Sequence, residues 1–393
     1  MEAKGAIIVL GTFDSKSEEH LFLRDAVAAR GLPALTVNAG TRGESGFSPD
    51  YDLRPGPGLS RDAAVSRVIE RGRELLAGLH AEGRVAGVVS AGGGTGTHIC
   101  TGIMKALPLG VPKVMVSTVA SRDMSAVVGT KDITMMHSVG DLLGVNSISG
   151  LILDQAAGAV CGMARSFWRA KNRKKTIGLT MFGFITAAAE AAKAALEGYG
   201  HEVVAFHANG TGGLAMEELA LEGRFDGILD LATHELADSL YQGGYCRLNG
   251  SGRLEPPGDG PAPPRLVVPG GLDCVVLEFT RDNVPAELGD RRIFFYDFRS
   301  AISLSREETL FLAGQLADKI NRHPARMKLL SPRGGWSEAA SAEGPLHDQG
   351  LAAEFMSLLR SRLRPEVEII ESDRHINDPA FAREAARIMN EML

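Results

Sequence analysis

The stretch "VAGVVSAGGGTGTHI", residues 85–99, decides the fold. It begins with a short apolar run, which is typical of a strand buried on both faces of a parallel sheet. Three consecutive glycines, Gly92, Gly93 and Gly94, follow at once, and another element begins near Thr97. A strand that passes through glycines into a helix indicates one βα unit of a doubly wound α/β fold.

Strands and helices alternate through the rest of the first half. Apolar runs that end at Gly or Pro predict buried strands, and amphipathic runs with capping residues predict helices. The strand-like runs are "GAIIVLGTF" (5–13), "LPALTVNAG" (32–40) and "VPKVMVSTVA" (111–120), and the helix-like runs are "DSKSEEHLFLRDAVAARG" (14–31) and "SRDAAVSRVIERGRELLAGLHAEG" (60–83). This alternation predicts a parallel sheet with helices on its faces.

The second half repeats this order. "RFDGILDLATHE" (224–235) parallels "RVAGVVSAGGG" (84–94), and "PPRLVVPGGLD" (263–273) parallels "VPKVMVSTVAS" (111–121). We therefore predict an α/β protein of two Rossmann-like subdomains, produced by an internal duplication, each a mainly parallel sheet flanked by helices. The basic run "RAKNRKK" (169–175) marks the boundary, so the expected domains are residues 1–172 and 173–393.

Composition excludes several classes of protein. The 393 residues carry 42 Lys+Arg against 48 Asp+Glu, a net charge of −6, which argues against a nucleic-acid-binding protein. The longest apolar stretch, residues 147–164, is interrupted by Asp154 and Gln155, so it predicts a buried helix and no membrane partner. Unpaired cysteine spacing and the lack of a secretion signal indicate a cytoplasmic protein with reduced thiols. These cysteines are Cys100, Cys161, Cys246 and Cys274.

The glycine run predicts a phosphate-binding loop at residues 92–97. Glycines allow backbone amides to approach an anion, Thr95 and Thr97 add hydroxyl groups, and a helix N-terminus favours negative charge. A tight strand-to-helix turn is the alternative interpretation. The loop lacks the Lys of a Walker motif, and Thr97 replaces the third glycine of the dinucleotide fingerprint. The nucleotide-binding candidates are Thr12, Asp14, Lys16, Gly92, Gly93, Gly94, Thr95, Gly96, Thr97, Ser117 and Thr118.

A second glycine loop, "NGTGG", lies in the other half. "GTGGLA" (210–215) fits the pattern GxGxxA, and Asp230 ends the following apolar run, so nicotinamide binding is a minor alternative. We expect this loop to bind a small organic acid instead. Its candidate substrate-binding residues are Asn209, Gly210, Thr211, Gly212 and Gly213.

Charged residues near strand ends are the candidates for catalysis. They are Lys16, Arg122, Asp123, Lys131, His234 and Glu235. Arg122 and Lys131 suit a phosphate or carboxylate, or are simply solvated surface charges. "THELAD" (233–238) imitates the zinc motif HExxH, but Asp238 replaces the second histidine, so no metal site of the protein's own is predicted there. Mg²⁺ is expected together with the nucleotide, with Asp14 or Asp123 as its ligand.

Five motifs in this order resemble a known family. They are "GTFDSKSEEHLFLRD" (11–25), "SAGGGTGT" (90–97), "STVASRD" (117–123), "HANGTGGLAMEE" (207–218) and "DLATHELAD" (230–238). The family is the bacterial and fungal one named for the ATP-binding N-terminal domain of the plant tomato mosaic virus resistance protein. The resemblance implies two Rossmann-like subdomains, ATP as cofactor and a homodimer.

These observations lead to one expected function and its alternatives. We expect an ATP-binding protein whose glycine loop holds the phosphates, and which acts as an ATP-dependent enzyme on a small organic acid. One alternative is a non-catalytic, nucleotide-responsive module that interacts with another protein. The other is an ATP-independent enzyme that acts on a phosphorylated or carboxylated metabolite.

Overall fold

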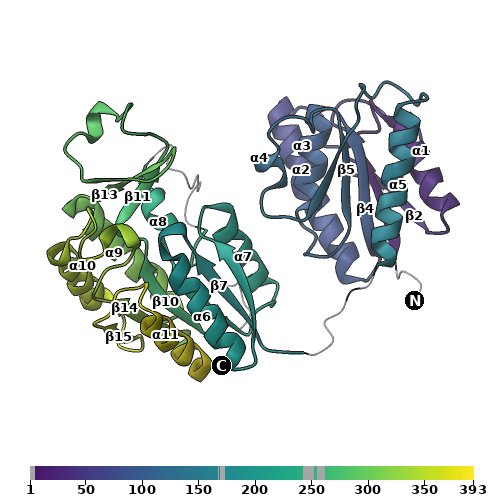
Figure 1. Cartoon of the computed structure of the whole chain (residues 1–393). Helices are drawn as coiled ribbons and strands as arrows, with labels where there is room; N and C mark the ends of the chain where they lie inside the picture. Colours follow the sequence, from purple (N-terminus) through teal and green to yellow (C-terminus); the bar gives the residue numbers. More distant parts are fainter. Residues whose placement is uncertain (1–4, 167, 169–172, 242–251, 255–261) are drawn as a thin grey trace. The chain divides into compact units, whose positions relative to one another are not determined.

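The computed structural model describes residues 5–166, 168, 173–241, 252–254 and 262–393. It divides into two compact units, Met1–Ala170 and Lys171–Leu393, and each unit is a sheet covered by helices (Figure 1). The predicted boundary segment, residues 169–175, lies partly outside the described residues.

The N-terminal unit contains a six-stranded parallel sheet in the order β3-β2-β1-β4-β5-β6. Its strands are β1 (Ala6–Gly11), β2 (Ala34–Asn38), β3 (Tyr51–Asp52), β4 (Val85–Gly92), β5 (Lys113–Ser117) and β6 (Ile133–His137). Its helices are α1 (Ser17–Ala29), α2 (Arg61–Ala81), α3 (Gly94–Met104), α4 (Ser125–Val128) and α5 (Ser149–Arg165). The strand order reverses between β1 and β4, which is where open α/β sheets form their ligand crevice.

Both faces of this sheet are buried because successive side chains of a strand point to opposite faces. Ile8 and Leu10 of β1 belong to the core formed with α2 and α3. Ile7 and Val9 belong to the core formed with α1 and α5. This double burial explains why β1 is a continuous apolar run in the sequence.

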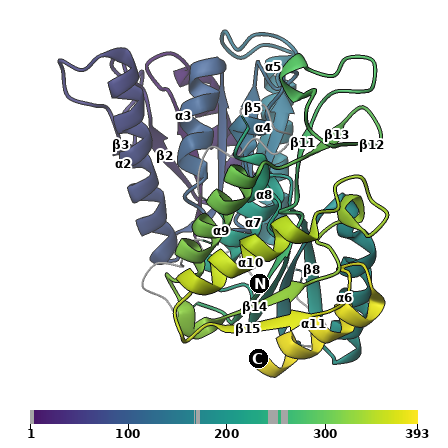
Figure 2. The same ribbon diagram turned by 90° about the vertical axis from the view of Figure 1, so that its left-hand side faces the viewer.

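The C-terminal unit contains a second six-stranded parallel sheet, in the order β15-β14-β10-β9-β7-β8. Its strands are β7 (Thr176–Met181), β8 (Glu202–His207), β9 (Gly227–Ala232), β10 (Arg265–Gly270), β14 (Met327–Pro332) and β15 (Glu368–Ser372). Its helices are α6 (Thr186–Gly198), α7 (Thr211–Leu221), α8 (Glu235–Asp238), α9 (Arg306–Ile320), α10 (Gln349–Arg362) and α11 (Pro379–Met392). Helices α6 and α11 pack beside each other, as do α9 and α10 (Figure 2).

A small antiparallel sheet also belongs to this unit. Its order is β11-β13-β12, and its strands are β11 (Cys274–Leu277), β12 (Ile293–Phe295) and β13 (Ser300–Ser303). Short 3-10 helices occur at η1 (Gly183–Ile185), η2 (Ala286–Leu288), η3 (Pro324–Arg326) and η4 (Glu338–Ala340). The sequence interpretation did not anticipate the antiparallel sheet, because its strands are only three or four residues long.

The predicted fold class is confirmed: both units are parallel α/β sheets flanked by helices. The two sheets share one arrangement, since β1 lies between β2 and β4 and β7 lies between β8 and β9, and only the N-terminal sheet has the extra short edge strand β3 beside β2. The strands whose sequences match between the two halves, β4 with β9 and β5 with β10, therefore occupy equivalent positions in the two sheets.

Two other expectations concern the helices and the thiols. No described helix combines the length and the apolar character that crossing a bilayer requires. Among the described cysteines, Cys100, Cys161 and Cys274 are buried and form no disulfide. Cys246 lies outside the described residues.

Candidate functional site

An open cleft of about 460 Å³ lies at the carboxyl end of the N-terminal sheet. Loops that follow β1, β2 and β4 form it, together with the first residue of α2. It therefore sits at the reversal of strand order, where ligands bind in doubly wound folds. Its lining residues are Thr12, Asp14, Ser15, Lys16, Thr41, Arg42, Gly43, Arg61, Gly93, Gly94, Thr95, Gly96 and Ile99.

The N-terminus of α3 forms one wall of this cleft. Its N-cap, Gly93, is extended, and no side chain caps the helix. The first amides of an α-helix have no partner within the helix, so this end presents unpaired N–H groups and the positive end of the helix dipole. A Cβ added at Gly94 would meet no heavy atom within 4 Å, whereas one at Gly92 would lie 3.1 Å from the Cα of Gly96. Gly94 thus faces open space, and Gly92 belongs to the packed turn.

Two arginines that the sequence interpretation missed lie in the cleft. Arg61 begins α2, and its Nη2 donates to the hydroxyl of Thr95 at 3.3 Å. Arg42 follows β2 and is exposed. Arg42 lies in a Gly- and Pro-rich loop, and Arg61 resembles any exposed helix residue, so no local pattern singled them out. Together they make the cleft suitable for an anion.

Asp14 and Lys16 line the cleft and also hold its walls. The Oδ2 atom of Asp14 accepts hydrogen bonds from the amides of Thr41 at 3.1 Å, Arg42 at 2.9 Å and Gly43 at 3.4 Å. The Lys16 ammonium donates to the carbonyl oxygen of Leu142. Both side chains therefore fix loops as well as contribute charge.

Several predicted nucleotide-binding residues lie elsewhere. Thr97 and Ser117 are fully buried, and their hydroxyl oxygens are 2.7 Å apart, so they join α3 to β5 rather than face the cleft. The Thr118 amide donates to the carbonyl of Gly92 at 3.2 Å, but Thr118 does not line the cleft.

The charged candidates that follow β5 are also outside the cleft. Arg122 and Asp123 are exposed and Lys131 is half-buried, and none of the three lines it. The Oδ1 atom of Asp123 accepts a hydrogen bond from the amide of Ser125 at 2.9 Å, at the start of α4. The structure therefore does not bring these charges to the phosphate-binding loop.

The second glycine loop, in the C-terminal unit, already holds an anion. The Oε1 atom of Glu235 accepts hydrogen bonds from the amides of Gly210 at 2.8 Å and Gly213 at 3.2 Å. Glu235 is completely buried, and a Cβ added at Gly213 would lie 2.2 Å from its Oε2. The protein's own carboxylate thus occupies the anion position that Asn209 to Gly213 were expected to offer to a substrate.

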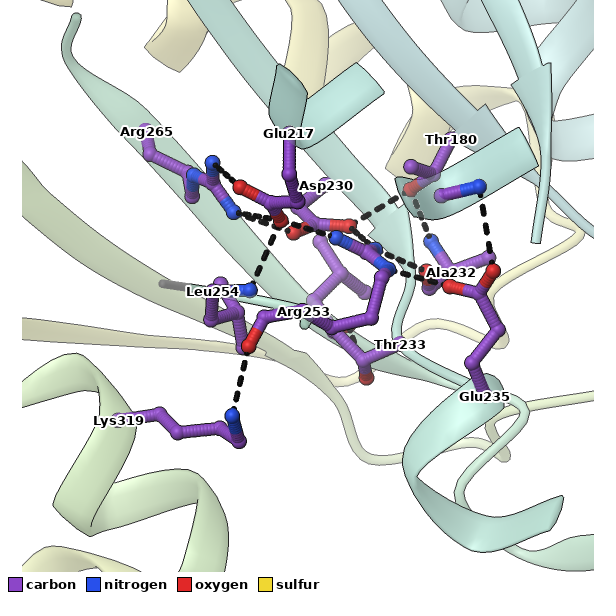
Figure 3. Close-up of polar contacts among 12 residues, drawn as sticks. Thr180, Glu217, Asp230, Ala232, Thr233, Glu235, Arg253, Leu254, Arg265 and Lys319 are labelled. Carbon is purple, nitrogen blue, oxygen red and sulfur yellow. Dashed lines mark hydrogen bonds and ion pairs between the residues drawn. The ribbon is translucent and has the colours of Figure 1, made fainter. Parts of the chain in front are cut away.

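Glu235 belongs to a buried ionic cluster that Figure 3 shows. Arg253 forms ion pairs with Glu235, with Glu217 and, at 2.6 Å, with Asp230. Arg265 pairs with Glu217 at 2.7 Å and with Asp230 at 3.1 Å. Burial raises the pKa of Glu217, but both arginines outweigh it and leave that pKa lowered. For Glu235 burial dominates and the pKa is raised.

This cluster contradicts the nicotinamide alternative. The Asp230 side chain would have to reach a ribose, yet it is fully buried and accepts hydrogen bonds from Arg253 and from the Thr180 hydroxyl, at 2.6 and 2.8 Å. Its carboxylate is committed to the core.

His234 is likewise committed to internal contacts. Its Nδ1 lies 2.7 Å from the carbonyl oxygen of Gly271, its Nε2 lies 3.1 Å from Oδ1 of Asp238, and its ring stacks on Phe182. Burial lowers the pKa of His234, but Asp238 and Gly271 outweigh it and the net pKa is raised. Nδ1 is within hydrogen-bond distance of the Gly271 carbonyl, whereas Nε2 lies close to the Asp238 carboxylate without a hydrogen bond of normal geometry. Within the described ranges, no group of three or more His, Cys, Asp and Glu side chains could hold a metal ion.

Two family models match almost the whole chain. The model described as "Uncharacterised protein family (UPF0261) N-terminal domain" matches residues 5–169, and its C-terminal counterpart matches residues 174–393. The chain belongs to the UPF0261 family. It is 36% identical to a UPF0261 protein of Clostridium tetani over 408 residues, 98% of each chain. It is 35% identical to one of Rhizobium meliloti over 402 residues, 96% of this chain and 97% of that protein.

The similarity to the plant protein is partial in length. The ToMV resistance protein Tm-1(GCR237) of Solanum lycopersicum is 30% identical over 418 residues, which cover 96% of this chain and 54% of the plant protein. The five motifs thus indicated a true relative, while membership of the UPF0261 family is the firm result.

Proposed function

We propose that the N-terminal unit binds a nucleotide, ATP, by its phosphates in the cleft between the ends of β1 and β4. The observation that carries this proposal is the uncapped N-terminus of α3, which opens into the cleft at Gly94. Phosphate groups bind at such helix ends because the free amides and the dipole both favour negative charge. Arg42 and Arg61 add positive charge to the same space.

The nucleoside would lie over the adjoining groove. Thr41, Arg42 and Gly43 line both this groove and the phosphate cleft, so the two are continuous. The groove has a volume of about 690 Å³ and runs along the loops after β2 and β3 to the start of α2. It offers room for a sugar and a base beside the phosphates. ATP as the particular nucleotide rests on the motif resemblance.

Mg²⁺ would bind together with the phosphates and would have few direct ligands from the protein. This ion keeps several waters and is usually held by one or two carboxylates plus the phosphates themselves. Asp14 fits this role through a water, because its carboxylate lines the cleft although Oδ2 already accepts three amides. Asp123 does not line the cleft and is not proposed as a ligand.

A pair of glycine variants tests the proposal. Gly94→Asp places a carboxylate at the first turn of α3 without a steric clash, and a negative charge there stabilises the helix. We therefore expect unchanged or slightly raised thermal stability and an ATP affinity lowered at least about tenfold in calorimetry with Mg²⁺. Gly78→Asp, in α2, makes the same charge change at a position with equally open space and should bind ATP like the natural protein. Equal affinity of all three proteins would refute phosphate binding at α3.

A further inference from the structure

A separate pocket lies in the C-terminal unit, at the carboxyl ends of β10 and β14. These strands are parallel neighbours, and Leu272 and Asp273 follow β10, while Arg333 and Trp336 follow β14. The pocket is small, with a volume of about 50 Å³. Its position beyond the carboxyl ends of parallel strands is the one at which α/β sheets bind ligands.

The carboxylate of Asp273, in the wall of this pocket, lacks a hydrogen-bond partner of normal geometry among the described residues. Both of its oxygens are buried, and neither has a hydrogen bond of normal geometry to a described residue. Burial raises the pKa of Asp273, and contacts of poor hydrogen-bond geometry with the Ser337 hydroxyl, its own amide and the Cys274 thiol, together with the charge of His234, offset this only in part. A buried carboxylate that receives no hydrogen bond costs stability unless a donor from outside completes it.

The arginines of the pocket do not supply that donor. The guanidinium of Arg292 is held by Oδ2 of Asp348 at 2.9 Å and by the carbonyl of His347 at 2.6 Å. Arg333 pairs with the exposed Asp373 at 3.1 Å. Both cations have anionic partners, so the unmet requirement in the pocket is for a hydrogen-bond donor and not for an anion.

The other walls are largely apolar. Trp336 is buried and packs edge-on against Phe355. The remaining apolar residues of the lining are Leu272, Leu304, Ala340, Leu346, Leu351 and Ala352. An apolar cavity with a few polar groups that fix orientation is the usual form of a small-molecule site.

We infer that this pocket binds a small organic molecule with an apolar body and a hydrogen-bond-donating head, an ammonium or a hydroxyl, that pairs with Asp273. The apolar walls accommodate the body, and the head completes the buried carboxylate. The site lies within the C-terminal unit and shares no residue with the nucleotide cleft, so it stands or falls independently of ATP binding.

Three probes with the same hexyl chain and different heads test this inference on the full chain. Hexylamine and hexanol should bind about tenfold more tightly than hexanoate, because only the first two donate to Asp273 and hexanoate is repelled by it. Asp273→Asn should lower the hexylamine affinity about tenfold, whereas the exposed Asp282→Asn should leave it unchanged. Affinities can be measured by saturation-transfer NMR titration.

A second variant separates binding in the pocket from a folding defect. Leu351→Trp fills the pocket from α10 without touching the charge of Asp273, and it should abolish binding of hexylamine and hexanol while thermal unfolding stays cooperative. Failure of the probes to bind, equal binding of all three heads, or an unchanged hexylamine affinity in Asp273→Asn would each overturn the inference.

Discussion

The Oε1 atom of Glu235 lies 2.8 Å from the amide nitrogen of Gly210, at the N-terminus of α7. The N-terminus of α3, which follows a different strand of the repeat, has no side-chain cap and opens into a cleft at Gly94. The two glycine loops therefore differ in one decisive respect. The C-terminal loop binds the protein's own Glu235 carboxylate, whereas no side chain caps the N-terminal loop, and we propose that a ligand's phosphates bind there.

Removal of the internal anion should destabilise the C-terminal unit. Glu235→Ala leaves Arg253 with one fewer buried carboxylate and leaves the amides of Gly210 and Gly213 without an acceptor. We expect the free energy of unfolding to fall by about 3–5 kcal/mol, the usual cost of breaking a buried pair. Urea denaturation followed by circular dichroism measures this, with the exposed Glu190→Ala as control. A loss below about 1 kcal/mol would mean that Glu235 is not a structural anion.

The guanidinium of Arg61 in the cleft should affect the affinity for ATP rather than the stability of the fold. Arg61→Ala removes the guanidinium that contacts Thr95, so ATP should bind about tenfold more weakly, and the affinity should depend less on salt. Arg67→Ala, on the same helix, removes an exposed arginine that pairs with Glu70, and it should change neither quantity. Calorimetry at two salt concentrations gives both values. Equal losses in the two variants would point to a general charge effect.

The buried hydroxyl pair should matter for the fold and not for the ligand. Thr97→Val deprives Ser117 of its partner at 2.7 Å, which should cost about 1–2 kcal/mol of unfolding free energy. In the Thr97→Val protein, the further change Ser117→Ala should lower the unfolding free energy by less than Ser117→Ala does in the natural protein, because the two hydroxyls are coupled. ATP affinity in the single variant should stay within about twofold of the natural protein. A large loss of ATP affinity with unchanged stability would mean that Thr97 takes part in ATP binding.

The raised pKa of His234 predicts how stability depends on pH. Burial works against the imidazolium, but Asp238 and the carbonyl of Gly271 more than compensate, so the folded pKa of His234 exceeds the ordinary histidine value of 6.5. The stabilisation is therefore complete below pH 6.5 and is lost as pH rises through the folded pKa. The difference in unfolding free energy between the natural protein and His234→Gln should shrink as the pH rises above 6.5. A difference that grows with pH would have the wrong sign for a buried imidazolium.

The fold could be predicted from the sequence because its signals are local. The strand "GAIIVLGTF" is apolar throughout since both of its faces are buried, and the glycine loops mark strand ends. The equivalence of β4 with β9 and of β5 with β10 was visible in sequence order alone.

The site could be predicted only in part because side-chain partners are set by tertiary contacts. Glu235 reaches a glycine 25 residues earlier in the chain, and Ser117 meets a threonine 20 residues before it. Arg42, in the loop after β2, and Arg61, at the start of α2, come together only at the end of the sheet. No spacing rule distinguishes a glycine loop that is already filled from one that is open.

A single titration of the full chain with ATP and Mg²⁺, followed by backbone amide NMR, tests which glycine loop holds the phosphates. We predict that the amide signals of Gly94, Thr95 and Gly96 shift strongly, because these groups would donate to the phosphates. Those of Gly210 and Gly213 should not move, because Glu235 already accepts their hydrogen bonds. Shifts at Gly210 and Gly213 with silent signals at Gly94–Gly96 would contradict the account.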